Sequence, residues 1–181
     1  MVVVSNASPL ITLSKLGQLN LLPALYNRVL IPSAVYEEVV VAGLRVGHVD
    51  AIAVDHLVRA GSIVVQSVKL SLKDDEWSSK IDIGEAEVIA LARETSAIWA
   101  IIDNAHARRA ARSVGVRPRG TVGVLLEAVS RGELTTVELE LLIEEIKHRP
   151  EFWISEQLCD AALERVRDEP RSDVNDAHGN R

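Results

Sequence analysis

The chain alternates short apolar runs with stretches of helical character, and this alternation limits its fold more than any other feature. Five runs have the composition of strands: residues 2–4, 28–31, 63–65, 98–102 and 116–120. Between or after them lie segments with helical spacing or composition: residues 9–16, 19–26, 33–40, 49–59, 105–113 and 122–130. Strands that alternate with helices favour a parallel sheet covered on both faces. The sequence therefore predicts a three-layer α/β/α sandwich with a central parallel sheet of four to five strands.

Two more helical patterns follow, over residues 135–147 and 155–167, separated by Pro150. Each has an apolar face that must dock on something, so these helices either cover the domain or mediate dimerisation. The predicted face of the first contains Val137, Leu141, Leu142 and Ile146, and that of the second Leu158, Ala162 and Leu163. We expect one domain over residues 1–167, with a core over 1–132 and C-terminal helices over 135–167. The polar residues 168–181 are expected to form a disordered tail.

Composition fits a single intracellular domain. A chain of 181 residues, with 48% hydrophobic residues, can bury one ordinary core. The lone cysteine, Cys159, excludes an intramolecular disulfide and a cysteine metal cluster. No apolar run approaches the roughly 20 residues that span a bilayer, and the N-terminus lacks signal-peptide features. We therefore expect a soluble cytoplasmic protein with no membrane contact.

Oxygen-bearing side chains follow two of the predicted strands. Asn6 comes after the first strand, and Asp103 and Asn104 come after the fourth. The carboxyl ends of parallel strands form the edge at which α/β proteins bind ligands, so these residues can be neighbours. Asn6 has a second interpretation, as a turn residue that bonds its own backbone. A hard cation would be the matching ligand.

Asp82 and Glu85 open a further helical pattern, and two interpretations remain for them. Asp at an N-cap with Glu three residues later forms a capping box, in which both carboxylates accept backbone N–H groups. Alternatively, a carboxylate projects from this first turn toward the strand ends. Gly84 between them permits close approach of a backbone or a phosphate.

A basic segment follows Asp103. It contains Arg108, Arg109, Arg112, Arg117 and Arg119 with no carboxylate among them, although the formal net charge of the chain is −6. The segment is either a phosphate-binding surface or a solvated helix face. Three further residues, Trp77, Trp99 and Trp153, are expected to serve as core or interface residues rather than base-stacking platforms.

Four motifs in order resemble those of the PIN-domain family. They are VSNASPLI at 4–11, DIGEAE at 82–87, IDN at 102–104 with ARRAA at 107–111, and GTVGVLL at 120–126. The resemblance covers about residues 1–132 and is to a prokaryotic subgroup related to the toxin ribonucleases of type II toxin–antitoxin systems. No single motif is specific, but four at suitable spacing make a strong signal.

The resemblance implies a cluster of acids that binds Mg²⁺ or Mn²⁺ at the carboxyl edge of the sheet and hydrolyses phosphodiesters. It implies Glu85 and Asp103 as catalytic residues. The implied metal ligands are Glu85, Asp103, Asn6, Asn104 and Asp82, and the expected substrate-binding residues are Thr121, Arg108, Arg109 and Arg112. The implied partners are an RNA substrate, an antitoxin protein and a second copy in a homodimer.

The sequence also departs from the family pattern. Asn6 stands where PIN nucleases usually carry Asp, and Asn104 replaces what is often a second Asp; each exchange removes one negative charge. Two hypotheses therefore stand. One is a metal-dependent endoribonuclease, the toxin of a two-gene pair; the other is a catalytically impaired PIN-like module that binds RNA or protein.

Overall fold

A computed structural model describes residues 1–70 and 80–168 of the chain. Its centre is a five-stranded sheet in the order β3-β2-β1-β4-β5, and every pairing is parallel. The strands are β1 (Val2–Ser5), β2 (Arg28–Ile31), β3 (Ile63–Val65), β4 (Trp99–Ile101) and β5 (Pro118–Arg119). The β-branched residues Val3 and Val4 of β1 are fully buried, as a central strand covered on both faces requires. The predicted parallel sheet is confirmed.

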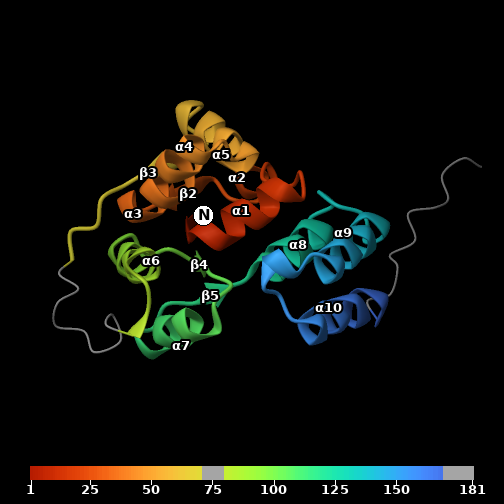
Figure 1. The fold of residues 1–181 in the computed structure, drawn as a ribbon. Helices are drawn as coiled ribbons and strands as arrows, with labels where there is room; N and C mark the ends of the chain where they lie inside the picture. The colour runs from red at the N-terminus through yellow and green to blue at the C-terminus, as the bar shows by residue number, and fades with distance from the viewer. Residues whose placement is uncertain (71–79, 169–181) are drawn as a thin grey trace, which may run out of the picture.

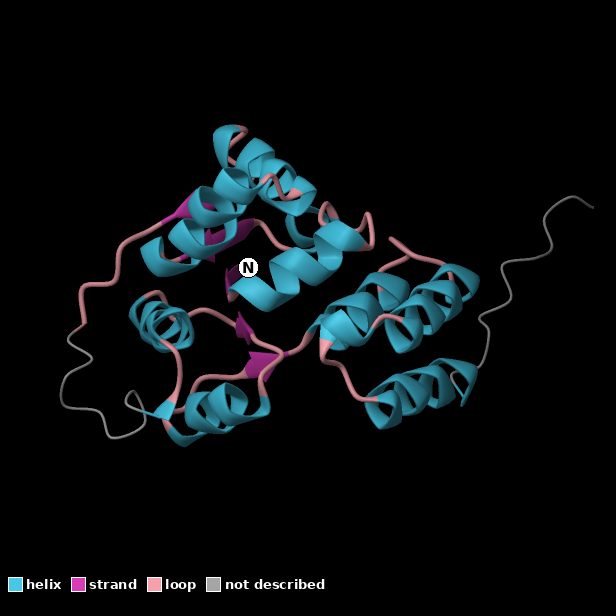
Figure 2. Ribbon diagram, viewed as in Figure 1, coloured by secondary structure: helices cyan, strands magenta, loops and turns pink. Residues whose placement is uncertain are grey.

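Helices cover both faces of this sheet (Figure 1). α6 (Ile83–Glu94) and α7 (Ala105–Ser113) lie on one face. α1 (Ala7–Lys15), α2 (Leu21–Leu25), α5 (Val49–Arg59) and α8 (Thr121–Ser130) lie on the other. Figure 2 shows the strands between these two groups of helices. The three-layer α/β/α sandwich is therefore the architecture of the chain.

The helical segment after β2 is longer than the predicted 33–40. α3 (Ser33–Tyr36), the π-helical turn η1 (Glu37–Ala42) and α4 (Gly43–Val46) follow one another without a break. Gly43 stays helical because it faces the next helix closely: a Cβ there would lie 2.7 Å from Cβ of Ala51. The segment ends at Gly47, whose φ of +78° is left-handed. Gly43 therefore serves helix packing and does not loosen the chain.

Two helices begin earlier than predicted. The first was predicted over 9–16, but Asn6 occupies the N-cap position and α1 begins at Ala7. Pro9 is then the third helical residue, which is tolerated because N–H groups in the first turn have no intrahelical acceptor. The helix predicted over 122–130 begins at Thr121, with Gly120 at the N-cap position.

The chain ends in two helices packed on α8, as predicted: α9 (Thr136–His148) and α10 (Glu156–Asp168), joined through the short 3₁₀ turn η3 (Pro150–Phe152). The predicted face of α9 is partly wrong, since Val137 and Leu141 are 65% and 67% exposed. The helix instead buries residues at the tighter spacing i, i+3, i+4 and i+7, namely Leu139, Leu142, Ile143 and Ile146. On α10, Ala162 and Leu163 are buried as expected, whereas Leu158 is 41% exposed.

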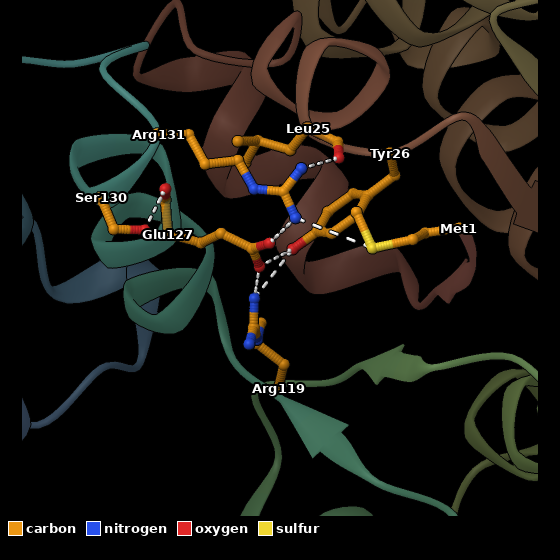
Figure 3. Close-up of polar contacts among 7 residues, drawn as sticks. All are labelled: Met1, Leu25, Tyr26, Arg119, Glu127, Ser130 and Arg131. Atoms are coloured by element: carbon orange, nitrogen blue, oxygen red, sulfur yellow. Dashed lines mark hydrogen bonds and ion pairs between the residues drawn. The ribbon is translucent and has the colours of Figure 1, made fainter.

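A charged cluster joins α2, β5 and α8 (Figure 3). The Glu127 carboxylate accepts a 2.8 Å hydrogen bond from the buried Tyr26 hydroxyl and forms ion pairs with Arg119 and Arg131. Arg131 also donates to the carbonyl of Leu25 at 2.8 Å. Burial raises the pKa of Tyr26, and the charges of Arg119 and Arg131 oppose that shift. The cluster therefore depends on Glu127 to balance two guanidinium groups.

Some predictions fall outside the described residues. Trp77 and the predicted tail beyond Asp168 lie there. Within residues 1–70 and 80–168, no helix combines the length and apolar character that crossing a membrane would require.

Candidate active site

A pocket of about 570 Å³ lies at the carboxyl edge of the sheet. Its wall is formed by five segments that are distant in sequence: the β1–α1 turn, η1, the start of α6, the β4–α7 turn with the first turns of α7, and residues 153–158. The polar residues that line it are Asn6, Ser8, Glu38, Asp82, Glu85, Asp103, Asn104, Arg108 and Ser155. Asn6, Glu85 and Asp103, which sequence analysis placed together, thus meet in one cavity.

Asp103 is the most firmly held carboxylate of the pocket. The backbone N–H of Thr121 donates to its Oδ1 at 2.7 Å, and the Thr121 hydroxyl donates to its Oδ2 at 2.7 Å. Ser8 adds a longer hydrogen bond of 3.4 Å to Oδ2. Burial raises the pKa of Asp103, while the bonds from Thr121 and Ser8 and the charge of Arg108 act in the opposite direction. Three hydrogen bonds, two from α8 and one from α1, therefore fix one carboxylate.

Thr121, predicted to bind substrate, is directed at Asp103 in the structure. Its side chain is fully buried and does not line the pocket. Both of its donors point at Asp103, so it positions that carboxylate. Gly120 beside it is equally constrained, because a Cβ there would lie 3.0 Å from Oδ1 of Asp103.

Asn6 and Glu38 meet above Gly84. Oδ1 of Asn6 and Oε2 of Glu38 lie 3.7 Å and 3.5 Å from the point where a Cβ on Gly84 would be. The glycine therefore leaves room for both oxygens to enter the pocket. Asn6 occupies the N-cap position of α1 but its side chain makes no capping bond there, so the structure does not favour the interpretation of Asn6 as a turn residue that bonds its own backbone.

Sequence analysis missed Glu38. It lies in η1, one turn beyond the helix start that follows β2, and no short motif surrounds it. The signal that could have predicted it was topological. Asn6 and Asp103 follow β1 and β4 at the carboxyl edge of the sheet, and an acid soon after β2 reaches the same edge. Glu38 supplies a carboxylate beside the neutral Asn6.

Both interpretations of Asp82 and Glu85 hold at once. The two residues form a capping box at the start of α6, in which Oε2 of Glu85 accepts the backbone N–H of Asp82 at 3.4 Å. Both side chains also line the pocket. The capping contact is long, so it does not withdraw Glu85 from the cavity.

The carboxylates of the pocket repel one another. Burial raises the pKa of Glu85, its bond to the Asp82 backbone opposes this, and the charges of Asp82 and Glu38 add to the rise. Desolvation and the charge of Asp82 also raise the pKa of Glu38. A bound cation would relieve this repulsion.

This repulsion predicts that Glu85→Gln stabilises the metal-free protein at neutral pH. A carboxyl whose pKa is raised by folding destabilises the folded state once it ionises, so stability falls as pH rises from the ordinary carboxyl pKa through the folded one. Glutamine keeps the size and the capping bond but carries no charge. Urea unfolding with chelator at several pH values should show the gain near pH 7 and its disappearance under acidic conditions. The exposed Glu133→Gln should show no such pattern, and a neutral-pH loss in Glu85→Gln would contradict the prediction.

The predicted phosphate-binding arginines separate in the structure. Arg108 lines the pocket, and its buried Nε has no hydrogen-bond partner among the described residues. Arg109 is exposed and contacts Nδ1 of His106 at 3.0 Å, and Arg112 is exposed elsewhere on α7. Neither of these two lines the pocket, so of the three predicted arginines the structure brings only Arg108 to the site.

The geometry changes the prediction for Asn104 and agrees with the one for Trp99. Oδ1 of Asn104 accepts the backbone N–H groups of His106 and Ala107 at 2.8 Å and 3.3 Å, so this residue caps α7 where it was predicted to bind metal. Trp99 is half-buried with the guanidinium groups of Arg117 and Arg119 4.2 Å and 3.9 Å from its ring centre, as an internal packing residue.

The donor set suits a hard divalent cation that keeps part of its water shell. Within residues 1–70 and 80–168, no three His, Cys, Asp or Glu side chains are arranged to enclose one metal ion. The oxygens that are available come from Asn6, Glu38, Glu85 and Asp103. Mg²⁺ commonly takes only one or two protein carboxylates and completes its shell with water and phosphate oxygens. The crowded carboxylates and the space above Gly84 therefore fit Mg²⁺ or Mn²⁺.

Comparison with known proteins agrees with this geometry. A family model described as a PIN domain matches residues 2–168. No curated protein and no solved structure matches the chain. The family match spans nearly the whole chain, including every element that lines the pocket. The chain belongs to the PIN-domain family.

Proposed function

We propose that this protein is an endoribonuclease that depends on Mg²⁺ or Mn²⁺. PIN domains are generally nucleases and typically use divalent metals. The observation that supports the proposal most is the pocket itself, in which Glu38, Glu85 and Asp103 face an arginine at the carboxyl edge of the sheet. Such a combination serves phosphodiester hydrolysis, in which a cation and a fixed positive charge neutralise the phosphate.

Each residue of the pocket has a task in this chemistry. Asp103, Glu85, Glu38 and Asn6 would hold the cation, with Asp82 adding negative charge nearby. When bound, the cation lowers the pKa of a water and stabilises charge on the phosphate. Arg108 lines the pocket, where its guanidinium would meet a phosphate oxygen. Thr121 and Ser8 keep Asp103 in one orientation.

More specifically, we propose that the protein is the toxin of a toxin–antitoxin pair and acts on cellular RNA in the cytoplasm. In this proposal an antitoxin protein inhibits it, and it works as a homodimer. The resemblance of the four motifs supports it. The alternative is an impaired binding module, which the neutral Asn6 and the helix-capping Asn104 favour. Glu38 weighs against that alternative, because it restores a carboxylate next to Asn6.

Metal dependence tests the nuclease proposal. We expect purified protein to cleave a single-stranded RNA with Mn²⁺ or Mg²⁺, to stop with EDTA, and to resume when metal is restored in excess. RNA binding without cleavage at any metal concentration would support the binding module instead.

Asn6→Asp distinguishes a weak nuclease from an impaired module. The added charge should lower the melting temperature without metal, through repulsion with Glu38 and Glu85, and should tighten Mn²⁺ binding. In a nuclease, cleavage rises with metal affinity; in an impaired module, only metal affinity rises. Calorimetric titration of Mn²⁺ beside an RNA cleavage assay measures both. Equal Mn²⁺ affinity in wild type and variant would show that Asn6 does not bind the metal.

A further inference from the structure

Trp153 contradicts the expectation that it is a core or interface residue. Its side chain is 92% exposed, although indole rings are ordinarily well buried. The same residue lines the pocket that contains Asp103 and Arg108. A large aromatic surface is therefore presented to solvent at the rim of the candidate active site.

The backbone holds Trp153 in this position at a cost. Its φ of +51° is left-handed, a conformation that is unfavourable for a residue with Cβ. The preceding Phe152 is buried, with the guanidinium of Arg149 4.4 Å from its ring centre. The N–H of Trp153 donates to the carbonyl of Pro150 at 3.3 Å. Phe152 is thus anchored while the side chain of Trp153 is turned outward. Backbone strain at a bulky residue beside a pocket indicates that the residue has a functional role.

The rest of the pocket indicates what the indole contacts. Ile154 and the partly exposed Leu158 extend an apolar wall beside Trp153. Arg108, with its buried and unpartnered Nε, lies in the same cavity. A ligand that satisfies both features has a negative group for the arginine and a flat apolar group for the indole. A nucleotide in a single strand has this combination, because its phosphate and its unstacked base are adjacent.

We infer that Trp153 is a base-stacking platform that positions RNA in the pocket, next to the phosphate held by Arg108. The inference rests on the proposed function and adds a binding subsite to it. Stacking on an aromatic side chain tolerates every base and requires an unpaired one. The subsite therefore selects single-stranded segments and sets how the strand enters the pocket.

Binding of a fluorescein-labelled RNA 10-mer, measured by anisotropy with Ca²⁺ replacing Mg²⁺, tests the inference. Trp153→Ala should weaken binding roughly 10-fold, and Trp153→Phe should retain most of the affinity. A duplex of the same length should bind wild type and Trp153→Ala equally. Leu141→Ala, at an apolar position on α9 that is 67% exposed and lies outside the pocket, serves as the control and should change nothing.

Two further measurements separate base stacking from a loss of folding and from a general loss of apolar surface. Trp153→Gly suits the left-handed backbone, so its fold should be retained while RNA binding is weakened as in the alanine variant. An RNA with abasic positions should lose affinity for wild type but not for Trp153→Ala. Equal binding by wild type and Trp153→Ala, or equal binding of intact and abasic RNA, would overturn the inference and leave cleavage untouched. Absence of both binding and cleavage in wild type would instead remove the proposed function and the subsite with it.

Discussion

Asp103→Asn should lower RNA cleavage by about 100-fold or more while leaving the fold intact. Replacing groups that merely support a metal ligand costs about 10- to 100-fold in activity, so removing the charge of a ligand should cost at least the upper value. The fold is retained because the amide oxygen can still accept the 2.7 Å bond from the Thr121 N–H. Single-turnover cleavage of a defined RNA, with circular dichroism to verify folding, measures the effect.

A surface carboxylate provides the matched control for Asp103. Asp160→Asn removes an exposed charge that pairs with Lys147, outside the pocket, and should cleave at the wild-type rate. A contaminating nuclease would be indifferent to both substitutions. Equal rates for wild type, Asp103→Asn and Asp160→Asn would therefore disprove the assignment of the site.

Glu127→Ala should lower the free energy of unfolding by about 3 kcal/mol, because it leaves partners of a largely buried carboxylate without compensation. The side chains of Glu127 and Arg119 are 13% and 19% exposed. Without the carboxylate, two arginines repel each other and the Tyr26 hydroxyl loses its acceptor, as Figure 3 makes visible. Burial already lowers the pKa of Arg119, which shows that its charge is costly at this position.

Urea denaturation compares Glu127→Ala with an exposed ion pair. Glu140→Ala breaks the contact with Arg167, in which both side chains are well exposed, and should cost under about 1 kcal/mol. The folded fraction of Glu127→Ala should still cleave RNA, since Glu127 does not line the pocket. A change of less than about 1 kcal/mol in Glu127→Ala would mean that solvent already compensates the two arginines.

The elements whose bounds the sequence predicted best are those delimited by local signals such as a glycine. β2, β3, α5 and α7 have the predicted bounds, and α5 is followed by Gly61 in the left-handed conformation. The helical run after β2 was predicted to end at residue 40, but it continues through Gly43 to Val46. Its true determinant is contact with Ala51, which no local pattern contains. Local sequence patterns therefore fail to predict where a helix ends when packing against another helix determines it.

The residues of the candidate site likewise fall into those that the sequence predicted and those that it did not. The positions of Asn6 and Asp103 followed from strand ends and parallel topology, which sequence pattern indicates. Glu38 and Trp153 could not be found, because one lies a turn inside a helix and the other depends on a strained turn between C-terminal helices. The family resemblance gave Thr121 a substrate-binding role. That its donors are directed at Asp103 becomes apparent only when β4 and β5 lie side by side.

The central place of β1 determines when the pocket can form during synthesis of the chain. β1 precedes every other strand, yet it pairs with β2 on one edge and with β4, nearly a hundred residues later, on the other. Until β4 has been made, one edge of a largely apolar strand has no native partner, and such edges promote association with other chains. Thr121, which donates hydrogen bonds to Asp103, is synthesised later still. The segment that contains Trp153 and forms part of the pocket wall is synthesised last. A growing chain therefore exposes an aggregation-prone edge long before it has a complete pocket, and this interval is when a chaperone would matter most.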